Sequence, residues 1–114
     1  MATNVQKTHS MAAGAGYSIP LGRDCAFVNL LAKADCYVRV VSSYNGDSTT
    51  APVASPAPGA GTTADWTHLA ASGDSYVCDY SKGFQSEATS FPKDRMTHVL
   101  VWAIAAGDLV INAR

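Results

Sequence analysis

The closing stretch THVLVWAIAAGDLVINAR constrains the fold more than any other part of the chain, because Asp108 and Arg114 are its only full charges. Its β-branched and aromatic residues predict two strands, HVLVWAIA and LVINA, and the break at residues 106–108 predicts that they form a hairpin. Alternate side chains of a strand face opposite ways. Both faces of HVLVWAIA are therefore apolar, with Val99, Val101 and Ala103 on one and Leu100, Trp102 and Ile104 on the other.

A strand with one face in water would alternate apolar and polar residues. Complete burial of one large apolar side chain is worth about 1.5–3 kcal/mol, so an uncovered face would forfeit several times that amount. Two arrangements avoid the loss. Either this strand is central in the domain and covered on both sides, or another subunit covers one of its faces.

Earlier segments also have the composition of strands. CAFVNLL and CYVRVVS, separated by residues 32–35, predict a second hairpin. The second run alternates between a core face (Cys36, Val38, Val40) and a face nearer solvent or a partner (Tyr37, Arg39, Val41). GYSIPLG predicts a short strand that Pro20 confines to an edge or an end, because proline cannot donate to a strand ladder.

DWTHLAASGDSYVCDY predicts two more strands, about residues 72–74, whose candidate inward residues are Trp66 and Leu69 or Tyr76 and Cys78. No window shows a sustained 3.6-residue apolar stripe with capping signals, so no helix is expected. The pattern predicts an all-β meander, a single-domain β-sandwich or jelly-roll-like barrel of about seven or eight short strands.

The domain organisation follows from composition. Residues 1–16, polar and then rich in Ala and Gly, are predicted to be a flexible N-terminal arm, and residues 17–114 a single β domain. The arm is either disordered or lies along a neighbouring subunit. Residues 51–65 hold three of the five prolines and two glycines, which predicts a long loop. Loops of this length either contact a partner or are disordered.

Charge argues against several classes of partner. The net charge is −1 and only 15% of residues are charged, with no basic run, so neither nucleic acid nor an anionic membrane is an expected partner. The first residues lack the basic and apolar regions of a secretory signal. No apolar run approaches the ~20 residues that span a bilayer. We expect a soluble protein made in a cytoplasm, with a neutral surface suited to contact with other protein.

No motif points to catalysis, a metal or a cofactor. Cys25, Cys36 and Cys78 make an odd count, which predicts free, buried thiols. No C-x-x-C or H-x-x-x-H spacing prepares a metal site, and no G-x-S-x-G elbow or phosphate loop is present. His98 beside Asp94 is the strongest candidate base, against the alternative of a histidine bonded locally at a strand end. We expect no enzyme and no cofactor.

Aromatic residues leave carbohydrate binding open as an alternative. Exposed rings beside polar groups could stack on sugars, and the sequence holds six candidates: Tyr37, Tyr44, Trp66, Tyr76, Tyr80 and Trp102. A carbohydrate-binding module predicts that Tyr44, Trp66 or Tyr80 is exposed. The structural alternative is that these rings lie in the core or at an interface with their polar tips satisfied.

Two stretches, AFVNLLAKADCYVRVVSS and VLVWAIAAGDLVINAR, resemble the small decoration or cement proteins of tailed-bacteriophage heads. The likeness lies in a strand, a short link and a CYVRV strand, and in an aromatic-Ala-Ile-Ala strand that turns at glycine into a short apolar strand. The loop at residues 51–65 and the charged stretch at residues 82–96 do not share the pattern.

The resemblance implies a virion structural protein that has no cofactor and binds the outer surface of a phage head at junctions between major capsid subunits. It further implies a homo-oligomer, with a trimer favoured, that is synthesised in the host bacterial cytoplasm. The candidate partner-contact residues are Tyr44, Pro52, Pro56, Pro58, Trp66 and Trp102. Another phage component, such as a tail or fibre-associated protein, is the alternative in the same setting.

Overall fold

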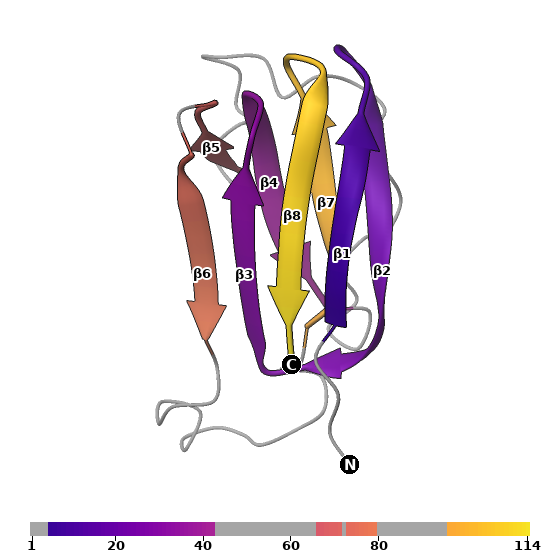
Figure 1. The fold of residues 1–114 in the computed structure, drawn as a ribbon. Helices are drawn as coiled ribbons and strands as arrows, with labels where there is room; N and C mark the ends of the chain where they lie inside the picture. Colours follow the sequence, from indigo (N-terminus) through magenta and orange to yellow (C-terminus); the bar gives the residue numbers. More distant parts are fainter. Residues whose placement is uncertain (1–4, 43–65, 72, 80–95) are drawn as a thin grey trace.

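The computed structural model describes residues 5–42, 66–71, 73–79 and 96–114, which form eight strands and no helix. Figure 1 shows the strands as two layers that face each other. They are β1 (Val5–Met11), β2 (Gly16–Cys25), β3 (Phe27–Ala32), β4 (Cys36–Val41), β5 (Thr67–Leu69), β6 (Ser75–Asp79), β7 (Met96–Ala103) and β8 (Gly107–Ala113). The predicted all-β fold is confirmed.

Each layer is an antiparallel sheet of four strands. Sheet A has the order β1-β8-β3-β6, and sheet B has the order β2-β7-β4-β5. Eight strands that alternate in this way between two packed sheets form a jelly roll. The sandwich or jelly-roll prediction therefore holds, whereas the expected meander of neighbouring strands does not, because successive strands mostly enter opposite sheets.

The core lies between the sheets and is built by the alternation of side chains along each strand. Sheet A contributes the inner residues of β3 and β8, and sheet B those of β4 and β7. The side chains with no exposed surface are Cys25, Val28, Leu30, Ala32, Cys36, Val99, Val101, Ala103, Leu109 and Ile111. All of these are apolar, so hydrophobic burial holds the two sheets together.

Both predicted hairpins are wrong, although the strands themselves are present. Strands β3 and β4 belong to different sheets, as do β7 and β8, so the short links between them cross the sandwich. The two strands of each pair still turn one apolar face to the same core, from opposite sides. Alternation specifies which side chains face inward, but not which sheet holds them.

The segment expected to be a flexible arm is a strand over Val5–Met11. It pairs with β8 along its whole length, from Val5 opposite Ala113 to Met11 opposite Gly107. Met11 is 4% exposed and belongs to the core. The arm prediction is therefore wrong for these residues, and the domain does not begin at residue 17. The polar side chains of β1 mark an edge strand with one face in solvent.

The links from β3 to β4, from β5 to β6 and from β7 to β8 cross between the sheets at one end of the sandwich, which we call the crossover junction. The Asp35 carbonyl accepts hydrogen bonds from the amides of Ile104 and Ala105, at 2.9 and 3.2 Å, and its carboxylate accepts one from Ala71 at 2.8 Å. Gly107 packs there against Ala34, and a Cβ on Gly107 would lie 2.5 Å from the Ala34 Cβ. Close approach therefore requires glycine at position 107.

Strands β1 and β2, at the edges of their respective sheets, are joined by side chains that cross the open side of the sandwich. The Lys7 ammonium donates to the Pro20 carbonyl at 2.7 Å, and the Tyr17 hydroxyl accepts the amide of Ala12 at 2.8 Å. The rings of His9 and Tyr17 meet edge to face, with centroids 4.6 Å apart. Pro20 lies on an edge strand as predicted, because β7 is the one partner of β2 among the described strands.

Candidate functional site

The described residues hold no cluster of three or more His, Cys, Asp or Glu side chains that could bind a metal ion. Cys25, Cys36 and Cys78 are free thiols. Burial raises the pKa of Cys36 to about 11, with a further contribution from the Asp35 carboxylate, and burial likewise raises the pKa of Cys25. A thiol that holds its proton is a poor nucleophile and a poor metal ligand. Cys25 and Cys36 are therefore packing residues of the core.

The candidate base His98 is bonded locally. Its Nδ1 lies 2.8 Å from the hydroxyl of Thr97, the preceding residue. Asp94, the proposed neighbour, lies outside the described residues. Asp74 accepts the amide of Ala70 at 2.9 Å, which makes it a turn residue. The contact of His98 matches the alternative of a histidine bonded locally at a strand end.

Of the six candidate partner-contact residues, the structure describes two. Tyr44, Pro52, Pro56 and Pro58 lie outside the described residues, as does the whole predicted loop at 51–65. Trp66 is half-buried and directly precedes β5, and Trp102 is half-buried near the end of β7. Both tryptophans therefore belong to sheet B or its margin.

Strand β7 is central in sheet B, between β2 and β4. Its inner residues are fully buried, and on the outer face Leu100 is only 3% exposed, although it lies outside the main core. The cover ends there, because Trp102 is half-buried and Ile104 is 42% exposed. The central position matches the first of the two arrangements, and among the described residues the outer side is covered at Leu100 and partly exposed at Trp102.

The outer face of sheet A combines aliphatic side chains with neutral polar ones, and we call it the amide–aliphatic face. Cross-strand register sets Thr8, Val110, Leu31 and Ser75 in one row and Gln6, Asn112, Asn29 and Val77 in the next. Val77 is 54% exposed. The charges described around this face lie at its two ends: Asp108 accepts the Ser10 hydroxyl at 3.2 Å, and the Arg114 guanidinium lies 4.4 Å from the Phe27 ring centroid.

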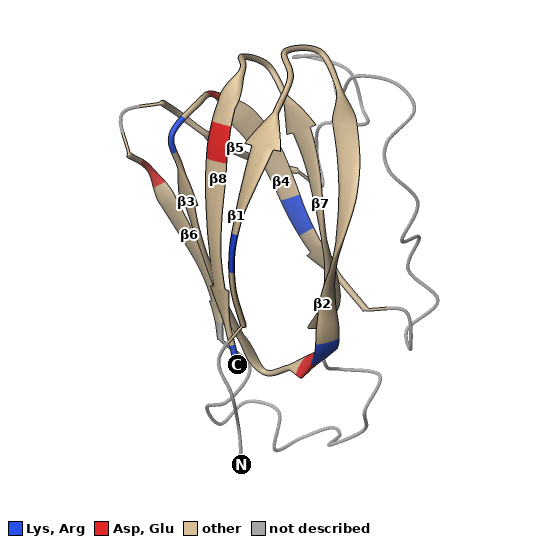
Figure 2. Ribbon diagram, turned by 45° about the vertical axis from the view of Figure 1, so that its right-hand side comes forward, with Lys and Arg blue, Asp and Glu red and all other residues tan. Residues whose placement is uncertain are grey.

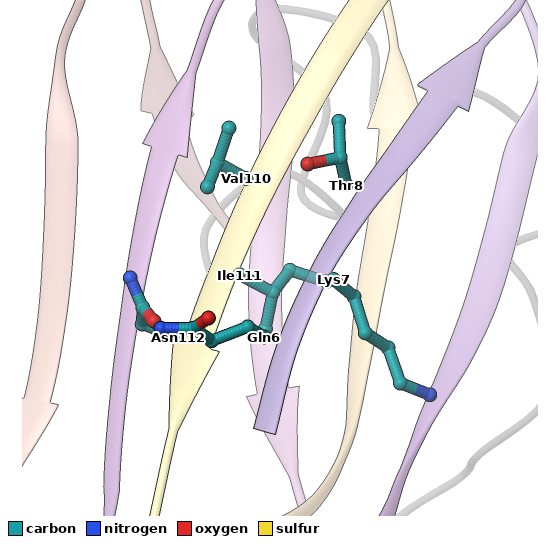
Figure 3. Close-up of a pocket in the computed structure, with 6 residues that line it drawn as sticks. All are labelled: Gln6, Lys7, Thr8, Val110, Ile111 and Asn112. Atoms are coloured by element: carbon teal, nitrogen blue, oxygen red, sulfur yellow. The ribbon is translucent and has the colours of Figure 1, made fainter. Parts of the chain in front are cut away.

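A shallow depression crosses this face where β1 meets β8. Figure 3 shows the side chains of Gln6 and Asn112 close together across the two strands, and Thr8 and Val110 in the row beyond. The Lys7 side chain extends in the opposite direction, toward β2. Lys7 also lines the depression, but its ammonium is directed to the Pro20 carbonyl, and Gln6, Thr8, Val110 and Asn112 are neutral. Such a lining is suitable for contact with a neutral protein surface.

The outer face of sheet B instead carries aromatic rings. Register pairs Trp102 of β7 with Tyr37 of β4, and Tyr37 with His68 of β5. We call these three residues the aromatic row. The Tyr37 and His68 rings lie 5.2 Å apart between centroids, with their planes tilted by 42°. Tyr37 and Trp102 are half-buried and His68 is exposed, so the row presents ring surface to solvent.

Sequence reasoning identified Tyr37 as facing outward but did not connect it with His68 or Trp102. The missing information was register, because β4, β5 and β7 are far apart in the chain and no local pattern aligns them. The signal available was the parity of each ring within its own strand. Of the other four rings proposed for sugar binding, Tyr44 and Tyr80 lie outside the described residues, Trp66 is half-buried and Tyr76 packs against the core.

Comparison with protein-family models, with curated proteins and with solved structures found no match in any of the three. In the part of the chain that the structure describes, no helix is long and apolar enough to cross a membrane.

Proposed function

We propose that this protein is a virion structural protein that binds the outer surface of a phage head at junctions between major capsid subunits and stabilises the shell. The observation that carries the proposal is the amide–aliphatic face. Its aliphatic residues Leu31, Val77 and Val110 alternate with the amides of Gln6, Asn29 and Asn112 across four rigid strands. Aliphatic contacts supply binding energy, and the amides supply hydrogen bonds that fix orientation.

The low charge of this face supports a protein partner. Ordinary surfaces carry many Lys, Glu and Asp residues, and interface centres are depleted in them. Here the described charges lie at the ends of the face, on Asp108 and Arg114, and each already has a partner. Docking on a neutral surface would therefore desolvate few charges, which keeps its cost low.

Repetition supports the mechanical role. A stable contact buries about 1,000 Å² or more, and an oligomer that engages several equivalent capsid subunits gains affinity by multivalency. We propose a trimer, which matches a threefold junction of an icosahedral shell. Jelly rolls are used in viral shells, but they also occur in lectins and enzymes, so the fold alone does not support one of these over another.

The test combines solution mass with particle binding. Light scattering across a hundredfold dilution in reducing buffer should give a stable trimer. Co-sedimentation with capsids assembled from the major capsid protein of the virus that encodes this chain should show saturable binding, reduced at least 100-fold by Leu31→Asp. The matched control is Tyr37→Ala on the opposite face, which should bind as the unchanged protein does.

A monomer at all dilutions would contradict the trimer, and normal binding by Leu31→Asp would remove the amide–aliphatic face from the contact. Immunogold labelling of virions separates the head from the tail. Label confined to the tail would replace this proposal with a tail or fibre-associated role.

A further inference from the structure

We propose that the aromatic row binds short glycans whose pyranose units carry carboxylates. The proposed site lies on sheet B, and its binding of a glycan does not depend on capsid binding. It arises from register: Trp102, Tyr37 and His68 stand on three adjacent strands, at mutually opposed positions.

The spacing of the row suits a chain of sugar rings. Neighbouring strands lie about 4.8 Å apart, so two strand intervals set Trp102 and His68 about 10 Å apart. The measured Tyr37–His68 centroid distance of 5.2 Å agrees with this spacing. Aromatic faces stack on the apolar C–H faces of pyranose rings, and the strands hold the rings in place before the ligand arrives. Little ordering cost is therefore added on binding.

Among the described strands, the row has an open flank toward β2. Gly16 of β2 is the residue opposite Trp102 in the ladder, so in this part of the chain no opposing side chain stands beside the indole on that side. On the other flank, His68 lies on β5, the edge strand of sheet B, and is exposed. A linear ligand can therefore extend past both ends of the row. A site open at both ends can hold a few units of a linear glycan, whereas a compact small molecule would be better held by a closed pocket.

The carboxylate preference comes from Arg39. It follows Tyr37 by two residues on β4, on the same face and about 7 Å along the strand, within reach of a ligand seated on the row. No described acidic residue forms an ion pair with Arg39, and the strands β4, β5 and β7 contain no Asp or Glu. In Figure 2 the band on β4 is blue and β7 carries no coloured band. Among the described residues the Arg39 guanidinium has no acidic partner, and a guanidinium can donate a bidentate pair of hydrogen bonds to a carboxylate.

Single-stranded nucleic acid also stacks on aromatic rings, but it requires a basic groove that follows the phosphates. Among the described strands β4, β5 and β7, Arg39 is the one residue with a full positive charge. A single arginine can pair with one carboxylate, but one positive charge is too few to pair with the successive phosphates of a nucleic acid. Because the two outer faces point in opposite directions, a molecule docked on a capsid by sheet A would present the aromatic row away from the shell. That orientation rests on the proposed function.

The test is calorimetric titration of the full chain with trigalacturonic acid and, as its matched neutral probe, the fully methyl-esterified trimer. We expect saturable binding of the acid, at least fivefold tighter than the ester. Trp102→Ala should weaken both by at least tenfold. Arg39→Gln should remove the preference for the acid while binding of the ester stays within twofold. Phe27→Ala, an aromatic substitution on the opposite face, is the control and should change neither affinity.

Thermal denaturation establishes that each variant is folded, and His68→Ala, at an exposed position, gives a second test if Trp102→Ala unfolds. The proposal is overturned by an absence of binding to both trimers, by equal affinities for acid and ester, or by tighter binding of a uridine hexanucleotide than of trigalacturonic acid. Capsid binding and glycan binding are measured in separate experiments. Either proposal can therefore be contradicted while the other is supported.

Discussion

The two outer faces of this sandwich share one core but have different chemistry. Sheet A presents Leu31, Val77 and Val110 among amides, whereas sheet B presents Trp102 and Tyr37 with an arginine. Each inner face is equally apolar, because burial against the opposite sheet imposes the same requirement on both. The outer faces are free of that requirement, so their differences point to binding. One face suits a flat protein surface and the other suits stacked rings.

Deletion of residues 1–11 tests the contribution of sheet A and has the largest expected effect on stability. If these residues were a flexible arm, stability would not change. Because β1 covers the edge of β8 and buries Met11, we expect the deletion to lower the free energy of unfolding by at least about 3 kcal/mol, measured by urea denaturation. An unchanged midpoint would show that sheet A does not need β1.

A change at the crossover junction should affect both faces together. Gly107→Ala brings a Cβ to 2.5 Å from the Ala34 Cβ, and relief of that overlap should lower the free energy of unfolding by about 1–3 kcal/mol. Ala106→Ser, at the neighbouring exposed position, is the control and should stay within about 0.5 kcal/mol. A loss confined to one binding activity would mean that the junction supports only that face.

Alkaline pH should lower the free energy of unfolding through the buried thiol of Cys36 in sheet B. Burial raises the pKa of the Cys36 thiol from its ordinary value of 9.0 to about 11 in the folded chain, and we take the ordinary value for the unfolded chain. Between these values the unfolded state has released a proton that the folded state keeps. The contribution of Cys36 to the free energy of unfolding is therefore fully present below pH 9 and is lost as the pH rises to about 11. At 1.36 kcal/mol per unit, the two-unit difference sets an upper limit of about 2.7 kcal/mol on this loss.

Cys36→Ala isolates this contribution, because other groups also titrate in this range. Chemical denaturation at pH 8 and pH 11 should show a smaller loss of stability in the variant than in the unchanged protein. Equal losses in the two proteins would assign the alkaline weakening to other residues, among them Tyr76, whose pKa burial also raises.

The smallest effect is expected at the margin of sheet A. Arg114→Met removes the guanidinium that lies 4.4 Å from the Phe27 ring centroid, while the backbone hydrogen bonds between these two residues remain. We expect a loss of about 0.5–1 kcal/mol in thermal or urea denaturation. Lys33→Met, which removes an exposed charge elsewhere, should have less effect. Equal effects would indicate that the stacking adds no stability.

Sequence patterns predicted the composition of the fold better than its connections. The alternation in CYVRVV correctly assigned Cys36 and Val38 to the core and Tyr37 to the outer side. The same alternation was consistent with a hairpin, and nothing local distinguished a link that turns within a sheet from one that crosses between sheets. The polar letters of β1 suggested an arm, because an edge strand with one wet face has few apolar residues.

The aromatic row was beyond prediction for a related reason. Tyr37 was assigned to the outer side of its strand, but its meeting with Trp102 and His68 depends on the register of three segments that are distant in the chain. The long-range pairing of strands is a property of the whole fold. Sequence reasoning therefore found aromatic candidates without finding which of them stand side by side.

The pairing of β1 with β8 also has a consequence for how the molecule is made. Among the described strands, the one that leaves the ribosome first has its ladder partner in the one that leaves last. Through most of translation β1 must wait with its edge and Met11 unprotected, and sheet A closes only when residues 107–113 emerge. All-β topologies with such distant contacts fold in about milliseconds to seconds. In that interval the nascent chain is most exposed to mispairing with its neighbours, and a chaperone would act on it then.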